Sequence, residues 1–343
     1  MSTIRIGILR GGPSYEHESS LLSGANIAKH INDDSVGGGR SFKKYIASDI
    51  FIDKKGQWHI GGIPKLPIDA INNFDVIVNS LHGTYGEDGA VQKILEISGV
   101  PYVGNNQYAA GATFNKGIFK SKIKEMGIKT PLYREFNLSV TDNLESVARE
   151  LFSNFPLPAI VKPASGGASI GVGVATSFET LLNSLRNAVQ YSNEVIVEEF
   201  IPGTEIVSGF VDGLRNQDTY ILLPVVISNE EKRMAQVNSK KWIGHLDDIS
   251  RAIGSYTTEL SREIGDVHKK QIEEIVKKVK GSIGLRHYAT FDFILSPRRG
   301  LYLIESDSSP HLHEDSPMLT SLKEAGVSAR DFFKHIVDVA VGK

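Results

Sequence analysis

Three carboxylates towards the C-terminus of the 343-residue sequence have a spacing that would let them bind one metal ion together. Asp292 lies within an apolar run, and Glu305 and Asp307 end a second apolar run. A hairpin with its turn centred between Arg298 and Arg299 would place Asp292 opposite Glu305, with Asp307 on the same face. Facing acids destabilise a sheet unless a cation neutralises them, and such oxygen ligands suit Mg²⁺ or Mn²⁺. The spacing predicts a metal site; the alternative is three acids that are solvated separately.

A lysine followed by a glycine-rich loop forms a second group. Lys162 lies near the end of a predicted strand, and the sequence SGGASIG follows at residues 165–171. Glycines allow successive backbone N–H groups to turn towards an anion, and a lysine adds a point charge for phosphate. This is not the P-loop pattern, which needs Gly-Lys-Ser/Thr at the start of a helix. Alone, the loop could be a simple hairpin turn, but beside the carboxylates it indicates a nucleoside triphosphate site.

A third group is an apolar strand predicted over residues 195–200, which leads into Pro202-Gly203 and then Glu205. The backbone of this strand could hold an adenine ring by hydrogen bonds, and Glu205 could hold a ribose. The alternative is a strand that ends in an ordinary Pro-Gly turn. The first two groups favour the nucleotide interpretation.

The elements that must position these groups alternate between strand and helix in the first hundred residues. Such alternation predicts a parallel sheet, whose ligands bind at the carboxyl ends of the strands. Two glycine-rich loops, at residues 11–14 and 82–89, lie at such ends. The predicted strands are 4–9, 43–52 and 75–80, and the predicted helices are 18–31 and 90–98.

The rest of the chain has an α+β pattern. We predict a domain boundary near residues 105–108, which gives an N-terminal domain at 1–105, a central domain at 106–200 and a C-terminal domain at 201–343. Helices are expected up to Gly127. Beyond it we expect strands at 159–163, 172–175, 195–200, 205–211 and 220–227, a charged loop at 239–259, a hairpin at 289–305, and helices at 178–191, 263–281 and the C-terminal end.

Composition limits the functions that the chain could have. A formal net charge of −2 argues against nucleic acid or an acidic membrane as a partner. The absence of cysteine excludes disulfides, thiolate zinc sites and cysteine nucleophiles. The start does not read as a signal peptide, and no apolar run is long enough to cross a membrane, so we expect a soluble cytoplasmic protein. No Gly-x-Gly-x-x-Gly follows the first strand, which excludes a dinucleotide oxidoreductase.

Several segments together resemble the ATP-grasp superfamily and, within it, the D-alanine–D-alanine ligases. They are GGPSYEHESSLLSG near the N-terminus, HGTYGEDGAVQ with GVPYVGNN, the SGGASIG loop and the acids of the hairpin. The resemblance covers nearly the whole chain. It implies an α/β fold of three domains: an N-terminal parallel-sheet domain, a central lid and a C-terminal domain with the metals. It also implies ATP, Mg²⁺ (or Mn²⁺) and amino acid substrates, and it is compatible with a homodimer.

The resemblance also implies a role for individual residues. They are Glu16, Ser169 and His311 for catalysis; His82, Glu16 and Ser316 for the amino acids; Lys116, Lys162, Ser169, Glu198, Glu199, Ile201, Glu205 and Lys241 for ATP; and Asp292, Glu305 and Asp307 for the metal.

The chain departs from the family pattern on the side of the second substrate. Thr290 replaces an arginine that stabilises the charge on the reacting carbonyl, and His311 replaces a glycine of the oxyanion site. Asp307 stands where the family usually has asparagine. We expect another cation to supply the missing charge. The candidates are His311, Arg286, Lys240 and Lys241.

Two further departures concern the lid. Ala168 replaces the loop serine that links to Glu16, and Trp242 replaces the tyrosine partner of that serine. The ATP half of the pattern is therefore well matched and the acceptor half is altered.

Three functions are compatible with this pattern. The first is D-alanyl-D-alanine synthesis for peptidoglycan through an acyl phosphate. The second keeps that chemistry but uses a different amino acid or small acid. The third is a non-catalytic nucleotide-binding relative, which Thr290 and His311 would suit, but the retained acids argue against it.

Overall fold

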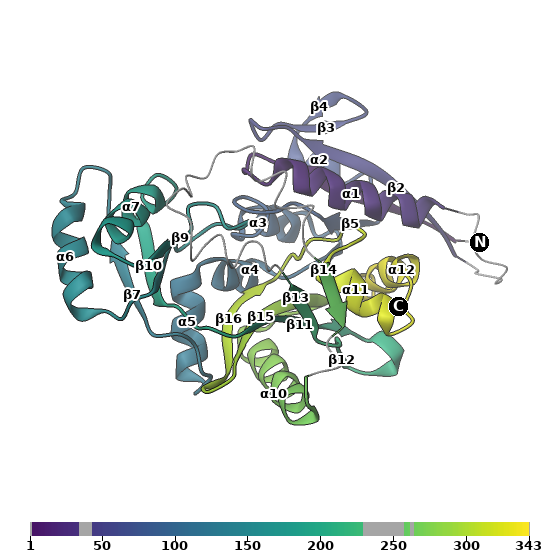
Figure 1. Ribbon diagram of the computed structural model, residues 1–343. Coiled ribbons are helices and arrows are strands. Elements are labelled where there is room, and N and C mark those ends of the chain that lie inside the picture. Colours follow the sequence, from purple (N-terminus) through teal and green to yellow (C-terminus); the bar gives the residue numbers. More distant parts are fainter. Residues whose placement is uncertain (1, 34–42, 229–256, 261–263, 343) are drawn as a thin grey trace.

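The computed structural model describes residues 2–33, 43–228, 257–260 and 264–342. Three β-sheets, each built from its own stretch of the chain, form the framework of the molecule (Figure 1). None of the helices in these residues is long and apolar enough to cross a membrane.

The first sheet is the predicted parallel sheet, extended at one edge. Its strand order is β4-β3-β2-β1-β5-β6, and β2, β1, β5 and β6 run parallel while β3 and β4 are antiparallel additions. The strands are β1 (Ser2–Gly11), β2 (Lys43–Ile52), β3 (Trp58–Ile60), β4 (Ile63–Lys65), β5 (Val76–Asn79) and β6 (Tyr102–Val103). The helices are α1 (His17–Asn32), α2 (Pro67–Ile71) and α3 (Ala90–Ser98).

Both faces of this sheet are buried, as the apolar character of its strands requires. Ile6 and Ile8 of β1 lie in one core with α1 and with α12 (Ala329–Ala340), a helix from the far end of the chain. Leu9 lies in a second core with α2 and α3. The carboxyl ends of β1 and β5 thereby hold their loops at one edge of a rigid layer.

The second sheet forms a small domain at one side of the molecule (Figure 1). Its order is β7-β10-β8-β9, from β7 (Tyr133–Asn137), β8 (Ala159–Pro163), β9 (Gly173–Ala175) and β10 (Glu194–Glu199). Helices α6 (Leu144–Asn154) and α7 (Phe178–Ala188) bury its apolar face. Ser177 and Thr180 form a reciprocal capping box that fixes where α7 begins.

The third sheet carries the hairpin and has the order β14-β13-β11-β15-β16, with β12 also paired to β11. Its strands are β11 (Thr204–Asp212), β12 (Thr219–Ile221), β13 (Val225–Ser228), β14 (Thr257–Leu260), β15 (Tyr288–Ser296) and β16 (Gly300–Asp307). The strand predicted at 220–227 is wrong in one respect, because it is split into β12 and β13. Pro224 lies in the break and has no N–H to donate to a ladder.

Three helices cover one face of the third sheet: α4 (Gln107–Phe114), α5 (Lys116–Glu125) and α10 (Asp266–Ile283). Phe291 and Phe293 of β15 lie in that core. Since side chains alternate along a strand, Asp292 lies on the opposite face, which is free of these helices. Helices α4 and α5 pack on the third sheet, and α12 packs on the first sheet, so these two hydrophobic cores include residues from more than one predicted domain. The predicted domain limits 1–105, 106–200 and 201–343 stay a prediction.

A half-buried histidine, His287, links the first and third sheets. The backbone N–H of Gly104 donates to His287 Nδ1 at 2.9 Å. Burial, and then the neighbouring Arg286 cation, lowers the pKa of His287 to about 4. The neutral imidazole is therefore the form that the folded chain accommodates.

Acid should weaken the fold through this residue. A histidine whose folded pKa is depressed stabilises the fold above its unfolded pKa, and that stability is lost as the pH falls towards the folded value. With an unfolded pKa near 6.5, the loss between pH 7 and pH 5 is about 2 kcal/mol. In His287→Asn the pH-dependent loss, measured by denaturant unfolding at both pH values, should be smaller by about this amount.

Asparagine is the suitable replacement because it offers an acceptor near the same place without titrating. It also tolerates a positive φ, and the φ of His287 is 64°. Equal losses of stability between pH 7 and pH 5 in the wild type and in His287→Asn would show that His287 does not cause the pH dependence.

Candidate active site

The hairpin of β15 and β16 brings the three predicted metal-binding acids onto one face of the third sheet. Asp292 lies opposite Glu305, and Thr290 lies opposite Asp307. Glu205 on β11 lies opposite Ile294 of β15, and so its side chain shares the face of Asp292.

The turn of this hairpin differs slightly from the predicted one, since it is centred on Arg298 itself. That centre alone would place Ile304 opposite Asp292. A β-bulge at Ile304 adds one residue to β16 and moves Glu305 into the facing position. The predicted pairing is present, but a different local geometry produces it.

The pKa values of the three acids are shifted by burial and by the neighbouring charges. Burial raises the pKa of Asp292 well above its usual range, and Glu305 and Asp307 raise it further. Burial likewise raises the pKa of Asp307, to about 6. The pKa of Glu305 is lowered instead, because Lys116 and Lys162 outweigh the opposing effect of burial. One acid of the facing pair is thus compensated by lysines and the other is not.

This patch suits a metal that keeps water and phosphate ligands. Among the described residues no group of three His, Cys, Asp or Glu side chains forms a metal site by itself. Mg²⁺ commonly binds to proteins through only one or two carboxylates together with substrate phosphates. The partly buried carboxylates of Asp292 and Asp307, with Glu305 facing Asp292, fit that requirement. Their role as metal ligands stays a prediction.

The two lysines predicted to bind phosphate come from different elements and approach the same acid. Lys162 on β8 has its Nζ 3.8 Å from Glu305 Oε2. Lys116 at the start of α5 donates to the carbonyl of Gly166 in the glycine-rich loop. It is also the cation with the largest lowering effect on the pKa of Glu305. The lysines, the loop and the acid patch therefore converge.

A third lysine, Lys120, does not emerge from the sequence analysis. Its side chain is fully buried, and its Nζ lies 3.3 Å from Glu198 Oε1. Lys162 Nζ lies 3.0 Å from the same oxygen. Burial lowers the pKa of Lys120 to about 8, although Glu198 opposes this shift. The spacing of four from Lys116 puts both on one helix face, and this is the signal that could have identified Lys120.

The remaining residues predicted to bind ATP follow one another along β10 and β11. The carboxylate of Glu198 is held by the two lysines, and that of Glu199 accepts from Leu132 N and pairs with Arg299. Ile201 is buried. The roles of these residues in ATP binding stay predictions. Lys241, like Lys240 and Trp242, lies outside the described residues.

The glycine-rich loop lies directly against the N-terminal domain. A Cβ atom on Gly167 would lie 2.3 Å from Glu16 Oε1, so a larger residue there would have to displace the Glu16 carboxylate. Ala168 and Ser169 have positive φ values of 49° and 57°, which are uncommon for such residues. The loop therefore meets Glu16 through the backbone of Gly167 despite the alanine at position 168.

His82 is buried in the same region as Glu16, and its ring contacts residues of two other segments. Its Nε2 lies 2.9 Å from Ser23 Oγ, and that hydroxyl accepts from Leu312 N at 3.2 Å. The Nδ1 atom of His82 lies 3.4 Å from Glu87 Oε1. Burial lowers the pKa of His82 well below its usual range, so the ring is neutral. Ser23 and Glu87 were not predicted; Glu87 lies in the HGTYGEDG segment.

His311 lies between the N-terminal and C-terminal parts of the site. Its Nε2 is 3.4 Å from Glu16 Oε2, and its ring centroid is 4.2 Å from that of His82. Burial disfavours the imidazolium, but the hydrogen bond to Glu16 and the charge of Asp307 outweigh it, so the pKa is raised. The Nδ1 atom is buried and has no hydrogen-bond partner among the described residues.

Two other predicted residues are occupied elsewhere. The hydroxyl of Ser316 is buried and accepts from Leu319 N at the start of α11 (Pro317–Glu324). Its substrate role stays a prediction. Arg286 donates to the carbonyl of Gly104 at 3.0 Å and stacks on Tyr102 at 4.5 Å. The prediction that Arg286 could supply the missing charge is therefore wrong, because its guanidinium is engaged at the junction of the sheets.

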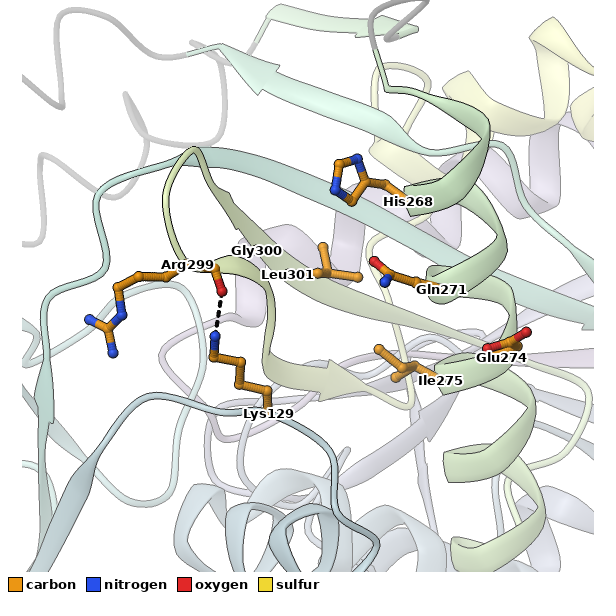
Figure 2. A pocket seen from close by; sticks show the side chains of 8 residues that line it. All are labelled: Lys129, His268, Gln271, Glu274, Ile275, Arg299, Gly300 and Leu301. Atoms are coloured by element: carbon orange, nitrogen blue, oxygen red, sulfur yellow. Dashed lines mark hydrogen bonds between the residues drawn. The ribbon is translucent and has the colours of Figure 1, made fainter.

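A cavity of about 380 Å³ lies on the other side of the hairpin, between its turn and α10 (Figure 2). Figure 2 shows Lys129 donating to the carbonyl of Arg299 at its edge. Leu301 lines it and belongs to the helix-covered core, so the cavity is on the face opposite the acids.

Comparison with known proteins gives two adjoining family matches. The family model described as "D-ala D-ala ligase C-terminus" matches residues 123–338, and the one described as "D-ala D-ala ligase N-terminus" matches residues 62–105. A D-alanine–D-alanine ligase from Carboxydothermus hydrogenoformans is 27% identical over 97% of both chains. One from Flavobacterium johnsoniae is 27% identical over 98% of this chain and 99% of its own.

Solved structures match the whole fold. D-alanyl-alanine synthetase A from Vibrio cholerae has a TM-score of 0.80 at 20% identity, and all of both chains is covered. The VanG D-Ala:D-Ser ligase from Enterococcus faecalis has a TM-score of 0.79 at 20% identity, with 99% of this chain and 100% of that chain covered. The architecture is accordingly the expected α/β arrangement of three domains.

Glu198 should be essential to stability because it is shared by two buried cations. Glu198→Gln removes the negative charge and leaves Lys120 and Lys162 uncompensated. Breaking a buried ion pair in this way typically costs about 3–5 kcal/mol, to be measured by chemical denaturation. The adjacent Glu199→Gln is the matched control. Its partner Arg299 is about half exposed, so losing the Glu199–Arg299 ion pair should cost less than about 1 kcal/mol. Equal costs for the two variants would contradict the buried network.

Proposed function

The chain belongs to the D-alanine–D-alanine ligase family, and on this premise we propose that it joins two D-alanine molecules with conversion of ATP to ADP and phosphate. The product would serve peptidoglycan precursor synthesis, and we place the reaction in the cytoplasm, where ATP is available. The observation that best supports the activity is the approach of Lys116 and Lys162, from two elements, to the acid that faces Asp292.

The first step needs a carboxylate to become an electrophile. Its negative charge repels nucleophiles, and transfer of the γ-phosphoryl group of ATP converts it into an acyl phosphate. Lys116 and Lys162 neutralise charge on the transferred group, and the backbone of the glycine-rich loop holds its oxygens. Glu205 is suited to the ribose because it lies on the same face of the sheet as the acids.

Asp292, Glu305 and Asp307 would hold Mg²⁺ or Mn²⁺, which when bound neutralises phosphate charge. In the second step the amine of the other amino acid attacks the acyl carbon, and phosphate leaves. Glu16 and His82 lie where the first amino acid would be held, and Glu16 carries a charge suited to its ammonium group. Contact between Gly167 and Glu16 closes the loop over this region, which excludes water that would hydrolyse the acyl phosphate.

A second candidate keeps the ATP chemistry but uses a different acceptor. It is favoured by the surroundings of Thr290, a neutral residue opposite Asp307, with the imidazole of His311 as the nearby cation. An acceptor that carries its own positive charge, or lacks a carboxylate, would suit such an acid-rich pocket.

Phosphate release with ATP and Mg²⁺, screened over a panel of D- and L-amino acids, tests these alternatives. D-Alanine should stimulate release and give a dipeptide by mass spectrometry. Glu305→Gln should lower kcat by about 10² or more, because it weakens the proposed binding of the metal that neutralises charge on the transferred group, while the melting temperature changes little. Release only with another amino acid would select the second candidate. No release with any would favour a non-catalytic relative.

His311 should provide the positive charge that Thr290 cannot. Losing a stabiliser of developing negative charge costs about 10² to 10³ in rate, so His311→Ala should lower kcat by that factor. His313→Ala is the matched control, because His313 is a neighbouring histidine 5.9 Å from the His311 ring and should matter little.

Thr290→Arg separates compensation from simple loss. In an active wild-type enzyme, the added arginine should bring little gain, and it should partly restore His311→Ala. If the wild type is silent and Thr290→Arg alone creates ligase activity, the idea that His311 compensates is wrong.

A further inference from the structure

The facing position of two acids depends on one extra residue in β16. The ladder pairs Phe293 with Leu303 and Asp292 with Glu305, so Ile304 is passed over. In a regular ladder Ile304 would face Asp292, and an isoleucine cannot bind a cation. The bulge therefore creates the acid pair, and it leaves the carbonyl of Ile304 outside the β15–β16 ladder.

A buried lysine binds that carbonyl. Lys120 Nζ donates to Ile304 O at 3.2 Å and to Thr130 Oγ1 at 2.9 Å. The same Nζ pairs with Glu198 Oε1 at 3.3 Å. An ammonium group has three donors, so two of them are used in these hydrogen bonds, and the ion pair with Glu198 adds a third contact.

Lys120 also connects the hairpin with the lid. Glu198 lies on β10 of the second sheet and is shared with Lys162, whose Nζ reaches Glu305. Two routes thus run from Lys120 to Glu305: one through the backbone of the bulge, and one through Glu198 and Lys162. Both routes end on the same carboxylate.

We propose that Lys120 is a positioning residue that keeps the bulge at Ile304 formed, and thereby holds Glu305 opposite Asp292 for a divalent cation. The proposal rests on the function proposed above. Because its side chain is fully buried, Lys120 acts through Glu305 and does not touch the nucleotide.

Two other roles for Lys120 give different results. A lysine that only stabilises the fold would affect unfolding but leave metal affinity unchanged. A lysine that contacts the nucleotide would affect nucleotide binding even without metal. The positioning role predicts weaker metal binding with metal-free nucleotide binding preserved.

Lys120→Met tests the proposal. Methionine is a long apolar side chain that fits a buried site, and the change leaves a neutral Lys162–Glu198 pair, so the fold should survive. Lys124→Met, on the exposed side of α5, is the matched control. Mn²⁺ binding to the protein–ADP complex is measured by electron paramagnetic resonance, and ADP binding in EDTA by calorimetry.

Lys120→Met should raise the Mn²⁺ dissociation constant by about 10-fold or more, the scale seen when supports of metal ligands are removed. ADP binding in EDTA should change by less than about 3-fold, on the reasoning that no direct contact is lost. The control should match the wild type. Unchanged Mn²⁺ affinity in Lys120→Met, or weakened ADP binding without metal, would overturn the proposal.

A second variant keeps the proposal testable if the Lys120→Met protein folds poorly. Deletion of Ile304 makes the ladder regular and places Glu305 opposite Asp292 without a bulge. Combined with Lys120→Met, the deletion should restore Mn²⁺ affinity and folding, whereas a double variant with neither restored overturns the proposal. A wild-type protein that binds no Mn²⁺ with ADP would overturn the proposed function as well, so the two failures are distinguishable.

Discussion

The repulsion between Asp292 and Glu305 is the constraint around which the site is built. Two partly buried carboxylates that face each other across a ladder are hard to ionise together without nearby positive charge. The chain supplies that charge unevenly, because its lysines favour the ionised form of Glu305 and leave Asp292 with a raised pKa. This uneven compensation suits a site that binds a cation together with a polyanionic substrate. The cation reduces the cost of burying the substrate's charge, and the substrate reduces the cost of burying the cation.

The three sheets each contribute a different part of this balance. The third sheet provides the acids, the second provides Lys162 and the glycine-rich loop, and the loops of the first sheet provide Glu16 and His82. Close contact between Gly167 and Glu16 means that the lid and the first sheet already meet in this structure. The chemistry therefore depends on the packing of separate sheets, and a change at a junction can affect the site without touching it.

The sequence predicts the elements well where hydrophobic periodicity is strong. The bounds predicted for β2, α3 and β8 agree with the structure, and the pairing of Asp292 with Glu305 is also present. The bulge was not predictable, because nothing in the local sequence distinguishes Ile304 from a regular strand residue. Lys120 was missed for a related reason: its importance comes from Glu198 and Ile304, which are distant in sequence. Arg286 was misassigned because closeness in sequence to Thr290 does not reveal that its side chain turns to Gly104 and Tyr102.

The exchange of a permanent cation for an imidazole changes how the acceptor side can work. A guanidinium keeps its charge in any surroundings, whereas the charge of His311 depends on Glu16 and Asp307. His311 stacks on a neutral His82, so the two rings approach without repulsion as long as only one is charged. In the proposed mechanism this arrangement links the residues that would hold the first amino acid to the residue that would stabilise attack on it. The departure at Thr290 is thereby connected with Glu16 and His82, which come from the loops of the first sheet.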